Sequence, residues 1–410
     1  MKVVLRLLRR MAGRSKPSPG RQREEGLEAA AKDWSRLCLK PESLRPGNRM
    51  RLLRNGTEAY PRMLEAIARA NRHILLEMYT FADDSVGGEF AAALSERAKA
   101  GVEVRILYDA AGSRETPREF FGRLRAAGCR VAAFRPLLDA LRRLRLPKRN
   151  HRKLLVVDGH TAYVGGLNLA RSYSAIEDGG LGWRDTQVEL QGPVVADLTG
   201  MFLELWRRER PGDPGPDPVP DRAPAPAGQV RALVLSSHAR RIRWEIGAHY
   251  RYAISQSRER IWIANAYFLP SGRFQRDLRR AVNRGVDVRV LVPARSDVAP
   301  ALYAAQRSFG RYLRSGIRLF EWSGPMMHAK TALIDSSWVT VGSYNIDHLS
   351  LVRNLEITAV AVDREIGSEM EAMFESDFAT CHELKREEWR LRGWKRRSLE
   401  ILCYPWRGFF

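Results

Sequence analysis

The sequence predicts an α/β protein made of two duplicated halves that pack around a pseudo-twofold axis and share one active site. The first observation is a pattern that occurs twice, as NHRKLLVVDGHTAYVGGLNLA over 150–170 and as MHAKTALIDSSWVTVGSYNID over 327–347. The second is an alternation of strand-like and helix-like segments before each copy. The copies stand 177 residues apart, counted from His151 to His328, which indicates a duplicated domain rather than a solenoid.

The first half begins with a buried strand and continues as an alternation of strands and helices. RHILLEMYTF (72–81) is typical of a buried strand, GGEFAAALSERAKA (87–100) has apolar residues at helical spacing, and VEVRILYD (102–109) alternates like a strand. A helix at about 116–127 and the strand CRVAAF (129–134) follow. Such an alternation predicts βαβ units and a mainly parallel sheet.

The second half repeats this order after a proline-rich stretch. PGDPGPDPVPDRAPAPAG (211–228) has no apolar periodicity and is typical of a stiff linker. Beyond it, RIWIANAYFLP (260–270) resembles 72–81, and GVDVRVLVP (285–293) resembles GVEVRILYD (101–109). The expected organisation is a basic N-terminal segment, a first domain, the linker, a second domain and a basic aromatic C-terminal segment, at 1–47, 48–210, 211–228, 229–380 and 381–410.

The net charge is strongly positive, with 69 Lys and Arg against 47 Asp and Glu, or +22. Such a surface attracts polyanions, either nucleic acid or an anionic membrane, and composition alone does not choose between them. The four cysteines lie far apart and form no Cys-x-x-Cys pair, which argues against a zinc or redox motif and favours a reducing compartment. No stretch of about 18 residues is both apolar and uncharged, so we expect no membrane-spanning helix.

Both copies of the repeated pattern fit His-x-Lys-x4-Asp-x6-Gly-[Gly/Ser]-x-Asn. With ordinary residue usage, a chance match at one starting point has a frequency on the order of one in ten million, and two matches at corresponding places exclude coincidence. A duplicated but inert structural motif is the alternative. The residues concerned are His151, Lys153, Asp158, Gly165, Gly166 and Asn168 in the first copy and His328, Lys330, Asp335, Gly342, Ser343 and Asn345 in the second.

The spacing gathers groups that suit a phosphate. Histidine and lysine two residues apart point to the same face of a strand, and the following glycine allows a tight turn that returns the asparagine beside them. The ammonium groups of Lys153 and Lys330 can bind phosphate oxygens and stabilise the charge of the transition state, as can the amides of Asn168 and Asn345. One histidine can attack phosphorus while the other protonates the leaving alcohol. Because two lysines supply positive charge, we expect no metal.

The attacking histidine must stay neutral and oriented, which a carboxylate behind its second ring nitrogen can achieve. The candidates are Asp185 in WRDTQVEL and Glu356 in RNLEITAV, both near the start of an expected strand. Asp158 and Asp335 complete the candidate catalytic set. They end apolar strands, however, where a structural salt bridge or a turn cap is the alternative role.

The double HxK(x)4D(x)6G[GS]xN resembles the signature of the phospholipase D superfamily, and the similarity in layout covers about residues 50–380. This resemblance implies a pair of α/β halves, a shared site and a phosphohistidine intermediate without a metal, and we expect no cofactor. In that superfamily the motif aspartate counts among the signature residues but is thought to act structurally. Several relatives are thought to use the first motif for attack, which implies that His151 is the nucleophile and His328 the general acid.

Within the superfamily, three stretches resemble bacterial cardiolipin synthases, and most of all the shorter kind without two N-terminal membrane helices: LPKRNHRKLLVVDGHTAYVGGLNLA, GWRDTQVELQGPVV and GSYNIDHLSLVRNLE. The resemblance implies transfer of a phosphatidyl group between two phosphatidylglycerol molecules, which yields cardiolipin and glycerol. One alternative is a phospholipase D-type phosphodiesterase that acts on other phospholipids or on nucleic acid. Another is a polybasic binding protein with an inactive site, against which the two intact motifs argue.

Two basic segments outside the motifs indicate a membrane partner. The stretch before the first motif places leucines on one stripe of a helix over 137–149, beside arginines, as expected for a helix on anionic lipid. A core-packed helix is the alternative. The C-terminal segment 386–410 mixes aromatic residues with Arg and Lys, which suits a membrane interface or stacking on single-stranded nucleic acid. We expect a protein peripheral to the cytoplasmic face of the bacterial cell membrane, with phosphatidylglycerol and the anionic membrane rather than nucleic acid as partners.

Overall fold

The computed structural model describes residues 35–135, 148–210, 212–213, 224–237 and 245–409. Three expected features fall wholly or partly outside these residues. They are the N-terminal segment up to residue 34, the basic helix over 137–149 up to residue 147, and the proline-rich linker at 211 and 214–223. Every helix within the described ranges is too short or too polar to cross a bilayer.

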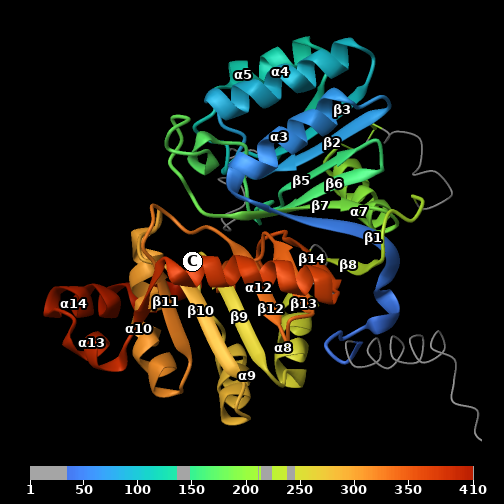
Figure 1. The fold of residues 1–410 in the computed structure, drawn as a ribbon. Coiled ribbons are helices and arrows are strands. Elements are labelled where there is room, and N and C mark those ends of the chain that lie inside the picture. The colour runs from blue at the N-terminus through green and yellow to red at the C-terminus, as the bar shows by residue number, and fades with distance from the viewer. Residues whose placement is uncertain (1–34, 136–147, 211, 214–223, 238–244, 410) are drawn as a thin grey trace, which may run out of the picture.

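One sheet of fifteen strands runs through both halves (Figure 1). The strand order is β1-β7-β6-β5-β2-β3-β4 in the first half and β8-β14-β13-β12-β9-β10-β11 in the second, where β15 is added at the edge. The first seven strands are β1 (Arg45–Arg54), β2 (His73–Met78), β3 (Glu103–Asp109), β4 (Arg130–Phe134), β5 (Leu154–Val157), β6 (Thr161–Gly165) and β7 (Thr186–Gln191). The others are β8 (Val230–Ser236), β9 (Arg260–Asn265), β10 (Asp287–Pro293), β11 (Arg318–Trp322), β12 (Lys330–Ile334), β13 (Trp338–Gly342), β14 (Ile357–Val362) and β15 (Cys381–Leu384).

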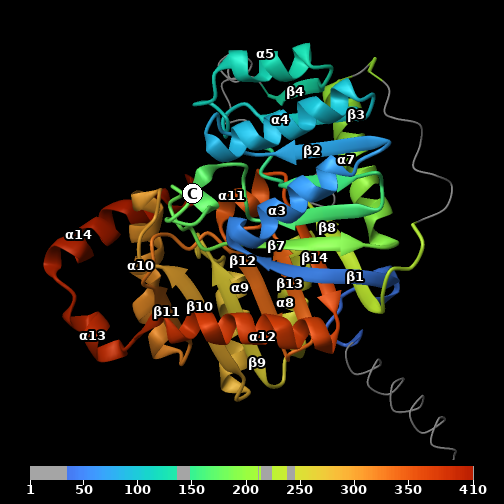
Figure 2. The ribbon, with the colours of Figure 1, turned by 45° about the horizontal axis from the view of Figure 1, so that its top comes forward.

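The two halves meet where β1 pairs with β8 in the antiparallel sense, with Arg45 opposite Ala232 and Asn48 opposite Val230. An antiparallel pair of strands is related by a local twofold axis, and each strand on one side of this pair has its counterpart at the same distance on the other. Figures 1 and 2 show the first half on one side of the β1–β8 junction and the second half on the other. The expected duplication around a pseudo-twofold axis is confirmed.

The expectation of a mainly parallel sheet is wrong. Among the described strands, only the pairs β2–β3, β3–β4, β9–β10 and β10–β11 are parallel. The motif strands reverse direction through three-residue turns, β5 into β6 at 158–160 and β12 into β13 at 335–337. So short a connection can join only antiparallel strands, whereas parallel strands need a crossover. The βαβ alternation therefore holds for the outer strands but not for the motif strands.

Helices pack on both faces of the sheet, and α12, whose apolar side chains belong to the cluster shared by the halves, crosses the strands of the second half (Figure 1). The expected helices at 87–100 and 116–127 are observed as α4 and α5. The helices of the first half are α3 (Asn55–Ala68), α4 (Ser85–Lys99), α5 (Arg118–Ala126) and α7 (Val194–Glu209). Those of the second half are α8 (Glu245–Gln256), α9 (Gly272–Asn283), α10 (Ala299–Arg314), α11 (His348–Val352) and α12 (Arg364–Ala379), followed by α13 (Arg386–Leu391) and α14 (Trp394–Cys403). Short 3-10 helices are η1 (Pro41–Ser43), η2 (Arg171–Tyr173) and η3 (Tyr404–Phe409).

An apolar core holds the two halves against each other. Each half has its own buried cluster, and a further cluster combines residues of both, such as Leu154 and Val188 with Leu333 and Ile357. A buried ion pair between Arg184 and Asp377, with nitrogen and oxygen 2.8 Å apart, also joins the halves. Because a fully buried leucine contributes about 1.5–3 kcal/mol, this interface holds the halves in a fixed relation.

The C-terminal segment folds back on the second half. Its strand β15 pairs with the edge strand β11, and the ring of Trp389 lies 5.4 Å from that of Phe309 on α10. Glu400 is fully buried and accepts two hydrogen bonds of 2.7 Å from Arg392. These contacts place α13, α14 and η3 beside α10, at one side of the molecule (Figure 2).

Candidate active site

Each motif histidine is held by the backbone of the other half. The His151 amide donates to the Leu355 carbonyl at 2.9 Å, and the His328 amide donates to the Arg184 carbonyl at 2.7 Å. Both histidines lie just before a motif strand, β5 or β12. The pseudo-twofold packing therefore interlocks the two motifs and brings them to a single site.

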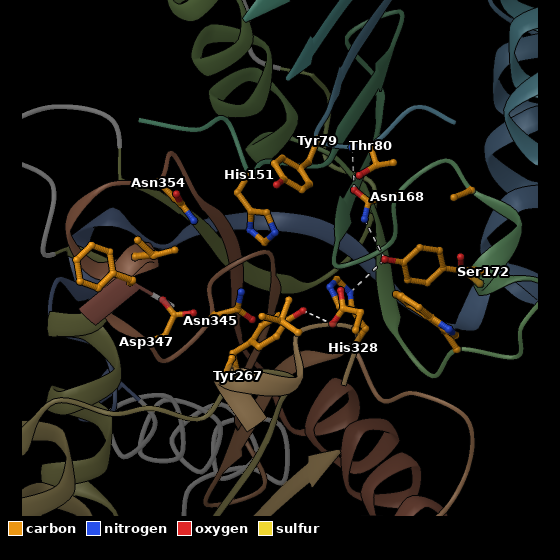
Figure 3. Close-up of a pocket in the computed structure, with 18 residues that line it drawn as sticks. Tyr79, Thr80, His151, Asn168, Ser172, Tyr267, His328, Asn345, Asp347 and Asn354 are labelled. Atoms are coloured by element: carbon orange, nitrogen blue, oxygen red, sulfur yellow. Dashed lines mark hydrogen bonds between the residues drawn. The ribbon is translucent and has the colours of Figure 1, made fainter. Parts of the chain in front are cut away.

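The two histidines line one cavity of about 410 Å³ (Figure 3). His151 and Asn168 come from the first half, and His328 and Asn345 come from the second. The cavity is lined by Tyr79, Thr80, His151, Asn168, Ala170, Ser172, Tyr173, Trp183, Tyr267, Asp297, Val298, Ala301, His328, Asn345, Asp347, Leu349, Asn354 and Phe409.

Each imidazole is oriented by a buried carboxylate from the opposite half. His151 Nδ1 lies 3.0 and 3.1 Å from the two oxygens of Glu356, and His328 Nδ1 lies 2.8 Å from Asp185 Oδ2. Both carboxylates are fully buried. The chain order places each carboxylate behind its own copy of the motif, whereas the structure exchanges them. With Nδ1 bound to a carboxylate, Nε2 is the ring nitrogen left for a substrate.

The surroundings of the site favour the neutral form of both imidazoles, but they shift the pKa values of the two carboxylates in opposite directions. Burial lowers the pKa of His151, which Glu356 opposes, and burial reinforced by Lys330 holds the pKa of His328 well below its usual value. Burial raises the pKa of Asp185 to about 6. Burial would also raise the pKa of Glu356, but interactions with His151 and other neighbours outweigh it and lower that pKa.

The interaction with His151 lowers the pKa of Glu356 most, and Glu356 also has a set of hydrogen-bond donors that Asp185 lacks. Glu356 accepts hydrogen bonds from the hydroxyls of Ser343 and Ser350 and from Asn354 Nδ2, the last two at 2.7 and 3.3 Å. Asp185 accepts the Thr186 amide at 2.7 Å. The position that matches Ser343 holds Gly166, where an added Cβ would lie 2.2 Å from Asp185 Oδ1. At this position of the repeat, the second half therefore has a hydroxyl that donates to Glu356, whereas the first half has a glycine that leaves room for Asp185.

Two buried lysines stand beside the histidines. Lys153 Nζ donates to the His151 carbonyl at 2.7 Å, and Lys330 Nζ lies 2.7 and 3.0 Å from the ring nitrogens of His328. Burial lowers the pKa of Lys330 to about 8, and burial with the nearby Lys330 ammonium lowers that of Lys153 well below its usual value. A bound phosphate would counter both effects, so the pair is suited to an anion.

The motif asparagines have different partners. Asn168 Oδ1 accepts the Thr80 amide at 3.1 Å, and its Nδ2 donates to the Tyr173 hydroxyl at 2.9 Å, which in turn lies 3.2 Å from His328 Nδ1. Asn345 Oδ1 is buried and has no hydrogen-bond partner among the described residues. Asn345 thus retains more capacity to bind a ligand than Asn168 does.

Sequence reasoning missed the aromatic walls of the cavity. Tyr79 and Tyr267 occupy corresponding positions of the two halves and both line the cavity. Their repetition in the strand segments 72–81 and 260–270 was a signal that could have found them. Tyr173 and Trp183 come from an insertion in the first half and have no such counterpart, so only the folded chain reveals them.

The structure places Asp158 and Asp335 outside the cavity, at the far ends of β5 and β12. Asp158 accepts the amides of residues 71–73 at 2.8, 2.8 and 2.9 Å, and Asp335 accepts those of residues 258–260 at 2.9, 2.9 and 3.1 Å. Asp335 also pairs with Arg36 at 2.7 Å. Both have positive φ, 54° and 48°, which aspartate tolerates better than most residues. These contacts are those of a turn cap. In the described parts of the chain, no three His, Cys, Asp or Glu side chains gather closely enough to hold a metal ion.

Known proteins share both the sequence pattern and the fold. The family model described as "Cardiolipin synthase, PLD-like domain" matches residues 63–206 and 250–378, one stretch in each half. Cardiolipin synthase A of Pseudomonas fluorescens is 36% identical over 380 residues, which cover 90% of this chain and 77% of the relative. The probable cardiolipin synthase YwiE of Bacillus subtilis is 33% identical over 363 residues, or 88% of this chain and 72% of the relative.

A solved structure supports the fold. The phosphatidylserine synthase of Haemophilus influenzae superposes with a TM-score of 0.69 over 93% of this chain and 99% of its own, at 13% identity. At that identity the likeness concerns the fold alone. The family model covers most of the chain and the relatives align with both halves, so this chain belongs to the phospholipase D-like cardiolipin synthase family.

Proposed function

We propose that this protein is a cardiolipin synthase, a phosphatidyltransferase that converts two phosphatidylglycerol molecules into cardiolipin and glycerol. The observation that carries this proposal is the pair of buried imidazoles that face one cavity, each bound through Nδ1 to a carboxylate of the other half. Two such imidazoles can serve as nucleophile and acid–base partner in a two-step transfer. The resemblance of the chain to cardiolipin synthases supports the choice of substrate.

The two steps use the same atoms in turn. Nε2 of the nucleophilic histidine attacks the phosphorus of one phosphatidylglycerol, the bond from phosphorus to the glycerol oxygen breaks, and glycerol leaves with a proton from the other histidine. That histidine then takes a proton from the terminal hydroxyl of a second phosphatidylglycerol. The hydroxyl oxygen attacks phosphorus, the bond from phosphorus to nitrogen breaks, and cardiolipin is released.

The electrostatic difference between the half-sites supports His151 as the nucleophile and His328 as the general acid. Glu356 has a lowered pKa and stays ionised, so it fixes His151 as a neutral imidazole with Nε2 unprotonated. Asp185 has a pKa of about 6, so the pair of Asp185 and His328 can hold an additional proton near neutral pH. A nucleophile needs the first environment and an acid needs the second.

The remaining motif residues would bind the phosphate. Lys153 and Lys330 place two positive charges beside the histidines, and the amides of Asn168 and Asn345 lie at the cavity wall. Such groups stabilise the charge that develops on the non-bridging oxygens in the transition state. Asp158 and Asp335 would act by holding the motif strands in place.

The net charge of +22 supports an anionic membrane as the partner surface and phosphatidylglycerol as the lipid substrate. Enzymes of this family act on phospholipids at membranes. We place the protein on the cytoplasmic face of the bacterial cell membrane as a peripheral protein, because cysteine usage favours a reducing compartment.

Product analysis tests the proposal. Purified protein is incubated with labelled phosphatidylglycerol vesicles and, separately, with other phospholipids and with single-stranded DNA, and the products are identified by mass spectrometry. Cardiolipin formed together with glycerol is the expected result, and His328→Ala should abolish it. His382→Ala, a surface histidine on β15, is the matched control. Cleavage of DNA, or hydrolysis of other phospholipids without cardiolipin, would replace the proposal with a phosphodiesterase.

A further inference from the structure

Exposed apolar side chains gather around the cavity mouth and on the C-terminal segment. Outside these places, the described chain exposes one further large hydrophobic residue, Leu39. The exposed large hydrophobic residues are Leu39, Ile176, Leu181, Val298, Leu391, Trp394, Leu399, Ile401, Leu402, Trp406 and Phe409. A soluble surface usually scatters such residues singly, so this concentration indicates an interaction surface.

The C-terminal segment contributes one side of the mouth. Phe409 lines the cavity although its side chain is 54% exposed, and its ring lies 5.6 Å from that of Trp406, which is 58% exposed. Figure 2 shows the C-terminus beside α11. The helix α14 directly precedes η3 and exposes Trp394, Leu399, Ile401 and Leu402.

A loop of the first half contributes the other side. Within residues 171–183, the chain turns back on itself through backbone bonds from Gly182 to Ser174 and from Trp183 to Ser172, both 2.9 Å. This loop lines the cavity with Tyr173 and Trp183, while Ile176 and Leu181 are 63% and 45% exposed. The apolar rim therefore includes residues from both halves, with Val298 at the cavity wall of the second.

Charge identifies the occupant of this surface. On the C-terminal segment, Arg392 and Arg396 point inward, to Glu400 and Glu321 respectively. Other exposed cations of the segment lie close to its tryptophans in the sequence: Arg390, Lys395, Arg397 and Arg407. Aromatic rings interleaved with exposed cations suit the headgroup region of an anionic bilayer, where rings insert and cations meet phosphates.

We propose that the apolar rim of Ile176, Leu181, Val298, Trp406 and Phe409, together with α14, seats the protein on an anionic lipid bilayer with the cavity mouth facing the headgroups. This inference rests on the proposed function, because the bilayer that seats the rim also supplies the substrate. The same surface then delivers that substrate, because a lipid can pass from the bilayer into the cavity without its acyl chains crossing water.

The test compares binding with turnover. The triple variant Ile176→Ser, Leu181→Ser, Trp406→Ser is compared with the wild type and with Leu39→Ser, which removes an exposed leucine elsewhere. Sedimentation with vesicles of phosphatidylglycerol, and with vesicles of phosphatidylcholine alone, measures docking. The triple variant should bind phosphatidylglycerol vesicles at least about tenfold more weakly, because it loses three membrane-inserting side chains. Leu39→Ser should bind like the wild type, and phosphatidylcholine vesicles should bind the wild type weakly.

Turnover separates docking from chemistry. On a water-soluble, short-chain phosphatidylglycerol, the triple variant should keep the wild-type rate, while its rate on vesicles falls. Unchanged vesicle binding, or an equal loss of rate on the soluble substrate, would overturn the inference. A wild type that docks through the rim but makes no cardiolipin would contradict the proposed function and leave the docking result intact. If the triple variant only converts a dimer to a monomer, the rim joins two copies of the chain and the inference is wrong.

Discussion

The two half-sites occupy equivalent positions around the pseudo-twofold axis, yet they differ in their affinity for protons. His151 faces a Glu356 whose pKa is lowered, and His328 faces an Asp185 whose pKa is raised to about 6. The histidines and their distances to the carboxylates are nearly alike. Duplication therefore determined the geometry, and the groups around each carboxylate determined its affinity for a proton.

The source of the difference is local. Ser343 and Ser350 donate to Glu356 and stabilise its charged form, while Gly166 leaves Asp185 room but offers it no side-chain donor. A buried carboxylate without such donors binds a proton more tightly. Two identical imidazoles can thus take different roles in one reaction because their supporting carboxylates differ.

The largest effects should come from the histidines. We expect His151→Ala and His328→Ala each to lower turnover of phosphatidylglycerol by about 10³-fold or more, since each acts in both steps. Acid-quenched reactions with labelled lipid distinguish the roles. His328→Ala should retain some covalent label, because slow attack continues without the acid, and His151→Ala should retain none. The reverse pattern would exchange the roles of the half-sites.

Replacing the two carboxylates that orient the histidines should lower the reaction rate by unequal factors. We expect Glu356→Gln to lower the single-turnover rate about 10³–10⁴-fold, because the neutral amide no longer holds His151 in the right tautomer. Asp185→Asn should cost less, about 10–10²-fold, because the Tyr173 hydroxyl also contacts His328 Nδ1. Asp363→Asn, which changes the N-cap of α12 away from the cavity, is the control. Equal losses in the two variants would show that the half-sites are equivalent in catalysis.

The pH dependence should be bell-shaped. In the first step His328 must donate a proton, so kcat/KM should fall as the pH rises through the pKa of Asp185, about 6, where the Asp185–His328 pair loses its additional proton, and fall further above the pKa of Lys330, about 8. It should also fall at acid pH, where Glu356 takes up a proton and no longer orients His151. The limb near pH 6 belongs to one half-site alone, and Asp185→Asn should remove it. A limb that persists near pH 6 in this variant would assign it to another group.

A smaller change makes the His151–Glu356 half-site resemble the His328–Asp185 half-site. Ser343→Gly removes a hydroxyl donor from Glu356, so the pKa of Glu356 should rise and turnover should fall about tenfold. The loss should be smaller than that expected for a whole hydrogen bond to a charged group, because other donors to Glu356 remain. The pH profile of kcat/KM should show its acid limb moved to higher pH. Ser315→Gly, at the C-terminus of α10, serves as the control. An unchanged profile would mean that Ser343 does not set the charge of Glu356.

The smallest effect on catalysis should come from the motif aspartates. Asp158→Asn and Asp335→Asn keep the positive φ but lose a charged acceptor, so each should lower the free energy of unfolding by about 1–3 kcal/mol. The loss should be larger at Asp335, which also pairs with Arg36. Turnover per folded molecule should stay near the wild-type value, as measured by active-site titration alongside thermal denaturation. A large loss of turnover in a fully folded variant would return these residues to the catalytic set.

The outer strands and helices were within reach of sequence reasoning. The segments 102–109 and 129–134 appear as β3 and β4, because alternating and continuous apolar runs report burial directly. The direction of the motif strands could not be predicted from the sequence. Their reversal depends on three-residue turns, in which the residues with positive φ are Asp158, Asp335 and Ser336 as well as a glycine. Aspartate and serine do not mark such turns as clearly as glycine does.

The sequence by itself determined the chemical groups of each half. These are an imidazole and an ammonium group at the start of one strand and an asparagine after the strand that follows. The covalent spacing of two residues is enough to put the first pair on one face of a strand. Only the tertiary structure decided which carboxylate serves which histidine. Glu356 reaches His151 and Asp185 reaches His328 because the apolar cluster shared by the halves presses the two motifs together across the pseudo-twofold axis. Contacts of that kind follow from packing between segments about 140–200 residues apart, which no local pattern records.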